Sequence, residues 1–159
     1  MNGKIKPFAW IMVLLVALVG TISCRTAAPL PAANLSAPGW HVLQGQALWK
    51  PNRKRSEVAA DLLLATNRTG DIFIQLTKDP FPLVTAEVLG NEWQIQFEGG
   101  KYSWHGRGAP PQQFPWFQLP RALSGERPAG DWRFENVSSN SWSLENPKSG
   151  ETLEGGFFP

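Results

Sequence analysis

Short runs of alternating apolar and polar residues, separated by turn residues, most constrain how this chain can fold, and they fill the sequence from Trp40 onwards. In the run 92–98, Trp93, Ile95 and Phe97 fall on one face, while glutamine and glutamate side chains fall on the other. Strict alternation of this kind is typical of a β-strand that buries one face. The sequence therefore predicts a domain made mainly of strands.

About nine such runs are expected, and most of the loops between them are as short as hairpin turns. Long helical crossovers, which parallel strands need, are missing, so antiparallel pairing is favoured. A succession of short antiparallel strands is typical of a sheet that curls or closes. We therefore predict a mainly β fold, a curved antiparallel sheet that forms an incomplete, half-open barrel. The expected runs are 40–49, 58–66, 71–77, 83–89, 92–98, 102–104, 131–137, 141–145 and 151–158.

One stretch, residues 115–125, favours a helix. Its apolar residues Trp116, Leu119 and Leu123 recur at helical spacing. Pro120 lies between them and is expected to limit the helix to one or two turns. The residues before this stretch are rich in glycine and proline, and we expect them to form a stiff loop across the mouth of the barrel.

The beginning of the chain resembles a bacterial lipoprotein signal peptide. A short positive segment, Met1 to Lys6, precedes a 15-residue apolar run at 8–22. This run is shorter than the roughly 20 residues of a membrane-spanning helix and fits a secretory signal. It leads into Thr-Ile-Ser-Cys24, which resembles the lipobox, whose cysteine is lipidated and becomes the mature N-terminus. The alternative is an uncleaved anchor with an incidental thiol.

Lipidation at Cys24 would hold the protein firmly at a membrane through its N-terminus. The next residue, Arg25, is not acidic, and in the lipoprotein resemblance this favours the periplasmic face of the outer membrane. Alanine and proline dominate up to residue 39, so we expect an extended tether that holds the domain off the bilayer. The predicted division is a signal peptide at 1–23, the lipidated cysteine and tether at 24–39, and one domain at 40–159.

Charge and composition exclude several functions. Without Lys4 and Lys6 the chain has 13 basic and 13 acidic residues, so it lacks the basic excess of a general nucleic-acid binder. A single cysteine excludes a disulfide framework, and His41 and His105 are too far apart for a metal motif. We predict no enzyme, no cofactor and no metal site. A hydrolase with two facing carboxylates stays open, because acidic residues are plentiful and none is singled out.

A basic cluster between the first two predicted strands contains Arg53, Lys54 and Arg55. Such a cluster can contact anionic lipid head groups, at about 1 kcal/mol per charge near the surface. The alternative is a solvated hairpin tip.

The segment Asp79-Pro80-Phe81-Pro82 joins two apolar strands. The prolines have no backbone N–H to donate to a neighbouring strand, so we expect a stiff loop. This loop would present Phe81 to a bilayer or to an apolar groove of a partner. The alternative is that Phe81 folds back onto the core.

Several segments together are similar in pattern to the bacterial outer-membrane lipoprotein-sorting family, which has the LolA/LolB fold. They are 40–45, 74–81, the Leu-Ser-Gly that ends at 125, and the closing hairpin 142–155. The resemblance implies an incomplete barrel with a helical lid over a hydrophobic cavity for acyl chains, without cofactor or catalysis. It also implies that Asp79 to Pro82 is the protruding loop that passes lipid to the membrane, with Phe81 as its apolar tip.

The resemblance implies an anchored lipoprotein that binds acyl chains or lipoproteins, acts in lipoprotein sorting and meets a periplasmic carrier protein. We expect a monomer. We select five aromatic residues, named at the end of this paragraph, as candidates for the cavity lining, and packing in an ordinary core explains them equally well. Two alternatives are an anchored β-sandwich that binds cell-envelope glycan through tryptophan platforms, and a structural envelope lipoprotein. The candidate lining residues are Trp93, Phe97, Trp104, Trp116 and Trp142.

Overall fold

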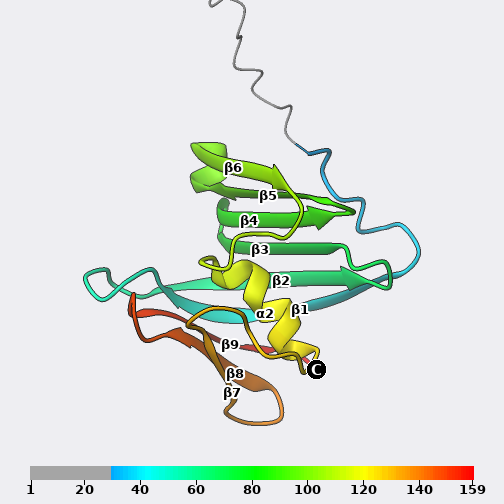
Figure 1. Ribbon diagram of the computed structural model, residues 1–159. Helices are drawn as coiled ribbons and strands as arrows, with labels where there is room; N and C mark the ends of the chain where they lie inside the picture. Colours follow the sequence, from blue (N-terminus) through cyan, green and yellow to red (C-terminus); the bar gives the residue numbers. More distant parts are fainter. Residues whose placement is uncertain (1–29) are drawn as a thin grey trace, which may run out of the picture.

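The computed structural model describes residues 30–159 and contains one antiparallel sheet of nine strands, in the order β6-β5-β4-β3-β2-β1-β9-β8-β7 (Figure 1). Its two end strands, β6 and β7, do not pair with each other, so the curved sheet is unclosed. The prediction of a mainly β, half-open fold is confirmed. The strands are β1 (Trp40–Lys50), β2 (Val58–Asn67), β3 (Ile72–Lys78), β4 (Phe81–Leu89), β5 (Glu92–Phe97), β6 (Tyr102–Arg107), β7 (Arg133–Asn136), β8 (Ser141–Asn146) and β9 (Glu151–Phe157).

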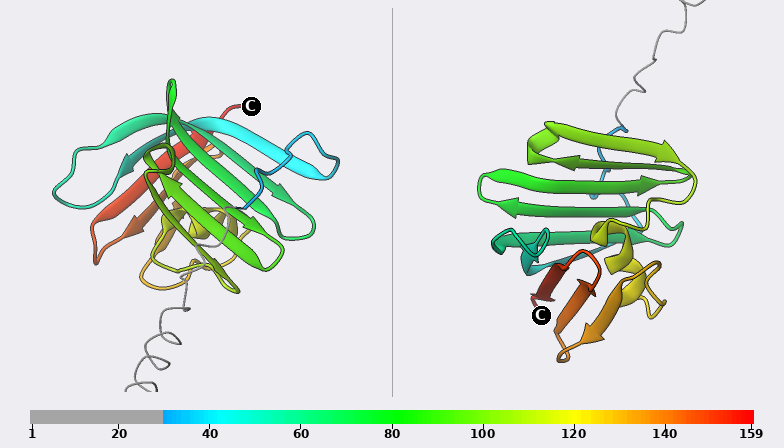
Figure 2. Two further views of the ribbon diagram at one scale, coloured as in Figure 1. Left: turned by 90° about the horizontal axis from the view of Figure 1, so that it is seen from above. Right: turned by 60° about the vertical axis from the view of Figure 1, so that its left-hand side comes forward.

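The chain crosses from one edge of the sheet to the other between β6 and β7. It does so as the helix α2 (Pro115–Leu123), which lies against one face of the sheet, called the inner face here (Figure 2). A short 3-10 turn, η1 (Glu98–Gly100), joins β5 to β6. The helix has nine residues, about two and a half turns, and includes Pro120, so it is slightly longer than the one or two turns expected. The proline removes one backbone hydrogen bond, and its side chain is buried.

The core is a single layer between the inner face and α2. Leu64 pairs with Ile74, Ile74 with Ala86, and Ala86 with Ile95, so buried side chains stand in line across four strands. None of these four residues is more than 2% exposed. The alternation at 92–98 therefore assigns Ile95 of β5 correctly to the buried face.

The sheet turns sharply where β1 meets β9, so that β7, β8 and β9 run at an angle to β3–β6 (Figure 2). Three glycines lie at this junction, Gly45 on β1 and Gly155 and Gly156 on β9. A Cβ atom on Gly45 would overlap the Gly156 carbonyl, and one on Gly155 would lie 2.6 Å from the carbonyl oxygen of Gln46. The two strands approach each other so closely because they lack these side chains.

The second part of the expected tether lies on the domain. The backbone N–H of Leu30 donates to Oε1 of Gln94 at 2.8 Å, on the sheet face opposite α2. Beside it, Glu87 is 5% exposed, and burial raises the pKa of its carboxyl. Leu30, which was assigned to the tether, therefore contacts the sheet. Cys24 and the predicted signal peptide lie outside the described residues, and no helix within 30–159 is long and apolar enough to cross a membrane.

We expect Gly45→Ala to lower the free energy of unfolding by about 2 to 3 kcal/mol, because the new methyl group must push β1 and β9 apart. Urea denaturation followed by tryptophan fluorescence measures this change. Gln44→Ala, at the neighbouring exposed position of β1, is the matched control and should change stability by less than about 0.5 kcal/mol. Equal stability of the two variants would contradict the account of the bend.

Candidate functional site

Seven aromatic rings fill one half of the inner face and make contact across it. Trp49 of β1 lies 6.2 Å from Phe97 of β5 and 5.3 Å from Trp116 of α2, measured between ring centroids. Because β1 and β5 are four positions apart in the sheet, their side chains meet only through its strong curvature. We call this group the aromatic cluster. Its members are Trp49, Trp93, Phe97, Trp104, Phe114, Trp116 and Phe117.

The helix is held on the inner face by the loops on either side of it. The indole N–H of Trp132 donates to the Gln112 carbonyl at 2.8 Å, which joins the loop before α2 to the loop after it. Gln118 of α2 accepts a hydrogen bond from the Ala129 N–H at 2.9 Å. These bonds, together with the buried side chains of α2, fix a cover over the middle of the inner face. One buried donor stays unsatisfied, since the indole N–H of Trp116 has no acceptor among the described residues.

Four of the five residues predicted to line a cavity belong to the aromatic cluster, namely Trp93, Phe97, Trp104 and Trp116. They pack against each other and α2. The fifth residue, Trp142 of β8, is separate, and its ring lies 5.9 Å from that of Phe157. The middle of the predicted cavity is thus filled by the helix that was expected to cover it.

A pocket of about 610 Å³ opens between the C-terminal half of α2 and the ends of β1, β2 and β3, and we call it the mouth pocket. Its apolar part is formed by Leu43, Leu64, Ile72 and Leu123. Polar and charged groups complete it, namely His41, Thr66, Asn67, Asp71, Arg121, Ser124 and Glu126. A volume of a few hundred Å³, an apolar floor and a few polar groups are the usual properties of a small-ligand site.

Asp71, at the edge of the mouth pocket, has a structural role. Its carboxylate accepts hydrogen bonds from the Gly90 N–H at 2.7 Å, the Asn67 amide at 2.8 Å and the Thr69 hydroxyl at 2.9 Å. The Gly90 N–H and the other donors lower the pKa of Asp71, against the opposing effect of burial. The group therefore stays ionised and ties the turn after β2 to the turn after β4.

A second carboxyl group, Glu151 of β9, contacts the aromatic cluster at the opposite end of the inner face. The indole N–H of Trp49 donates to its Oε1 at 3.0 Å. Burial raises the pKa of Glu151 to about 7, although the bond from Trp49 acts in the other direction. Nothing in the sequence marked this pair, because its members lie 102 positions apart.

The hairpin tips at 51–57, 79–80, 98–101 and 147–150 all lie at one end of the sheet, which we call the tip end (Figure 1). The structure thereby brings together the two segments predicted to contact a membrane. Seven basic residues lie at or beside these tips against four acidic ones, Glu57, Asp79, Glu98 and Glu151. The basic residues are Lys50, Arg53, Lys54, Arg55, Lys78, Lys101 and Lys148.

The predicted head-group residues differ in their contacts. Arg53 Nη2 donates to the Pro147 carbonyl at 2.6 Å and so joins the β1–β2 tip to the β8–β9 tip. Lys54 and Arg55 are exposed and form no ion pair within residues 30–159. Their charges are therefore available to an anionic surface.

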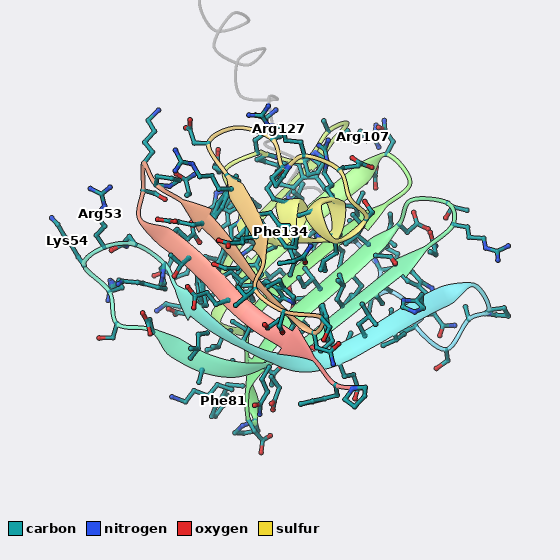
Figure 3. All side chains as sticks on the ribbon, turned by 90° about the horizontal axis from the view of Figure 1, so that it is seen from below. Arg53, Lys54, Phe81, Arg107, Arg127 and Phe134 are labelled. Carbon is teal, nitrogen blue, oxygen red and sulfur yellow. The ribbon has the colours of Figure 1, made fainter. Side chains whose placement is uncertain are left out.

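Phe81 is 70% exposed and projects from the sheet on the side away from α2 (Figure 3). The expected loop is shorter than predicted, since only Asp79 and Pro80 form the turn and Pro82 lies within β4. The strand accepts this proline because the register shifts at Leu76 and Thr77 of β3, directly opposite. A residue at such an irregularity need not donate to the ladder.

The fold and these sites define a half-open β-barrel with a helix-covered apolar face and a basic tip end that carries one exposed phenylalanine. Comparison with known proteins finds no family model that matches the chain and no similar curated protein. The resemblance to the lipoprotein-sorting family therefore stays a prediction. Within residues 30–159 no cluster of three or more His, Cys, Asp or Glu side chains could hold a metal ion.

We expect Glu151 to make the domain less stable as the pH rises from 4.5 towards 7. In this range Glu151 is protonated in the folded protein and ionised in the unfolded chain, so the free energy of unfolding falls as the pH rises. Above the folded pKa of about 7 the group is ionised in both states and the loss of stability is complete. Glu151→Gln keeps an acceptor for Trp49 and removes the titration. The variant should therefore be more stable than the wild type by roughly 2 kcal/mol at pH 8 and nearly equal to it at pH 4.5.

Urea denaturation at a series of pH values measures this difference. Glu145→Gln, an exposed residue of the neighbouring strand, is the control and should follow the wild type at every pH. A Glu151→Gln variant that keeps the pH slope of the wild type would contradict the assignment.

Proposed function

We propose that the protein is a cell-envelope lipoprotein, anchored through Cys24, that binds acyl chains of lipids or lipoproteins on the inner face of its half-barrel. The observation that carries the proposal is the mouth pocket, where the inner face is not filled by α2. Leu43, Leu64, Ile72 and Leu123 give it an apolar floor. Acyl chains bind to such a surface by apolar contact with few directional bonds.

The charged edge of the mouth pocket suits the polar end of a lipid. Arg121 lies there and is also in contact with Glu126, whose carboxylate accepts a hydrogen bond from its Nε at 3.2 Å. Both side chains are about half exposed, at 46% and 60%, so their pair is a weak one that a lipid carboxylate or phosphate can displace.

The tip end would rest on the membrane. Phe81 supplies an apolar group for insertion, and Lys54 and Arg55 supply unpaired charges for anionic head groups. Cys24 and Leu30 are six positions apart, and an extended chain of that length covers at most roughly 20 Å. Leu30 is hydrogen-bonded to Gln94, and Gln94 lies three residues before the end of β5 at the tip end. An anchor at Cys24 can therefore reach the same membrane. In this arrangement the mouth pocket opens away from the bilayer, towards a lipid carrier.

Exposed tryptophan platforms for glycan have less support. Of the seven tryptophans in residues 30–159, Trp104 is the one with an exposed ring, at 48%. It contacts Phe97 and Phe114 from the inner side of the sheet. The fold is also one sheet rather than the two of a sandwich.

We expect saturable quenching of tryptophan fluorescence when the domain from Arg25 onwards binds a brominated fatty acid. Shortening the acyl chain by two methylenes should weaken binding by about tenfold, because each buried methylene contributes about 0.8 kcal/mol. Leu123→Glu places a charge in the mouth pocket and should weaken binding by at least about tenfold. Near-UV circular dichroism verifies that each variant is folded.

Val42→Glu is the matched control for this experiment. It makes a similar apolar-to-acid change on β1, on the face opposite α2, where Val42 is 40% exposed. Binding to this variant should equal that of the wild type. Equal weakening by both variants, or no quenching of the folded wild type, would contradict acyl binding at the mouth pocket.

We expect the same domain to bind vesicles that contain anionic lipid through its tip end. Lys54→Gln with Arg55→Gln should weaken binding by about 2 kcal/mol, roughly 30-fold, because each charge near an anionic surface contributes about 1 kcal/mol. Phe81→Ala should weaken binding further and should do so in neutral vesicles as well. Co-sedimentation with vesicles of both compositions measures these effects.

The control removes two positive charges elsewhere. Arg68 and Arg107 lie at the end of the sheet opposite the tip end, and Arg107 is labelled in Figure 3. Arg68→Gln with Arg107→Gln should leave vesicle binding nearly unchanged. If this pair weakens binding as much as the tip-end pair does, the membrane does not recognise the tip end.

A further inference from the structure

The face of the sheet opposite α2 has a pocket of its own, of about 740 Å³, which we call the outer groove. It is formed by six neighbouring strands, from β3 through β2, β1, β9 and β8 to β7. Leu48, Glu154, Ser143 and Glu135 stand in one row across four of these strands. These residues alternate along their strands with buried inner-face residues, so the groove lies on the outer surface. A twisted sheet is saddle-shaped, and this explains a hollow on the face away from the barrel interior.

The outer groove is acidic although the chain as a whole is nearly neutral. Four carboxylates line it, those of Asp61, Asp79, Glu135 and Glu154, against one ammonium group, that of Lys78. None of the four forms an ion pair within residues 30–159. Their negative charge is therefore not neutralised by the domain itself, and it attracts a cationic partner.

The same groove has apolar groups that a small cation would not use. Leu48 is 43% exposed and Val137 is 64% exposed, and both line the groove. A peptide offers both complementary groups, since it has cationic and apolar side chains.

We propose that the outer groove binds an extended basic segment of a partner protein, which presents lysine or arginine and apolar side chains on the same side. Five strand spacings separate β3 from β7, at most roughly 24 Å. An extended peptide of about seven residues covers this distance. Alternate residues of such a peptide face the same side, so a cation can meet Glu135 or Glu154 while an apolar residue two positions away contacts Leu48 or Val137. This inference does not depend on acyl binding at the mouth pocket.

The test uses the full-length chain in nanodiscs of phosphatidylcholine and a fluorescein-labelled heptapeptide, Lys-Ser-Leu-Ser-Lys-Ser-Leu, whose lysines and leucines face the same side when it is extended. Fluorescence anisotropy should show saturable binding that weakens with added salt. Glu135→Lys with Glu154→Lys should raise the dissociation constant by at least about tenfold. The matched control, Glu57→Lys with Glu98→Lys, makes the same charge change at the tip end and should leave the dissociation constant unchanged. Thermal melting verifies that the variants are folded, and each replaced glutamate is exposed.

Further measurements distinguish a peptide from the other possible occupants of the outer groove. Val137→Ser and a peptide in which serine replaces both leucines should each weaken binding several-fold; if neither does, the groove attracts cations without recognising a peptide, and the proposal fails. Equal weakening by the groove pair and the control pair also overturns it, as does the absence of saturable binding. Sedimentation of the chain without peptide tests a second copy, because self-association abolished by Glu135→Lys would assign the groove to the basic tips of another molecule.

Discussion

The structure depends on burying the long apolar inner face of a single sheet. Within residues 30–159 there is no second sheet to pack against this face. Curvature brings Trp49 and Phe97 together across the inner face, but it leaves a hollow that side chains from the strands do not fill. The helix α2 fills that hollow with Trp116, Phe117 and Leu119, each at most 1% exposed. Because the chain must also travel from the β6 edge to the β7 edge, one segment makes the topological crossing and completes the core.

This arrangement separates three surfaces of different chemistry. The inner face is apolar and is accessible beside the end of α2, the tip end is basic with Phe81 exposed, and the outer groove is acidic. In the functions proposed above, opposite charges on different parts of a nearly neutral domain would let an anionic membrane and a basic protein segment bind at the same time. The glycines at the junction of β1 and β9 make this possible, since the close approach of these strands bends the sheet.

Alternation in the sequence predicted the strands and, for β5, the side chains that share the inner face, because a period of two is set by the strand backbone itself. The sequence could not predict contacts that depend on curvature. Trp142 was grouped with Trp93 and Phe97, yet it lies apart from them, since the bend at β9 separates β8 from β5. Phe117 was overlooked because helical spacing marks one stripe of apolar residues, whereas the loops around α2 bury nearly its whole circumference.

The central claim is that acyl chains bind beside α2 on the inner face. The most direct measurement is NMR of the methyl-labelled domain with a fatty acid that carries a nitroxide near its methyl end. The account predicts that the signals of Leu43, Leu64, Ile72 and Leu123 broaden at low ligand concentration, while that of Val42 on the opposite face does not. Broadening of Leu48 and Val137 in the outer groove, with the mouth pocket signals unchanged, would contradict it.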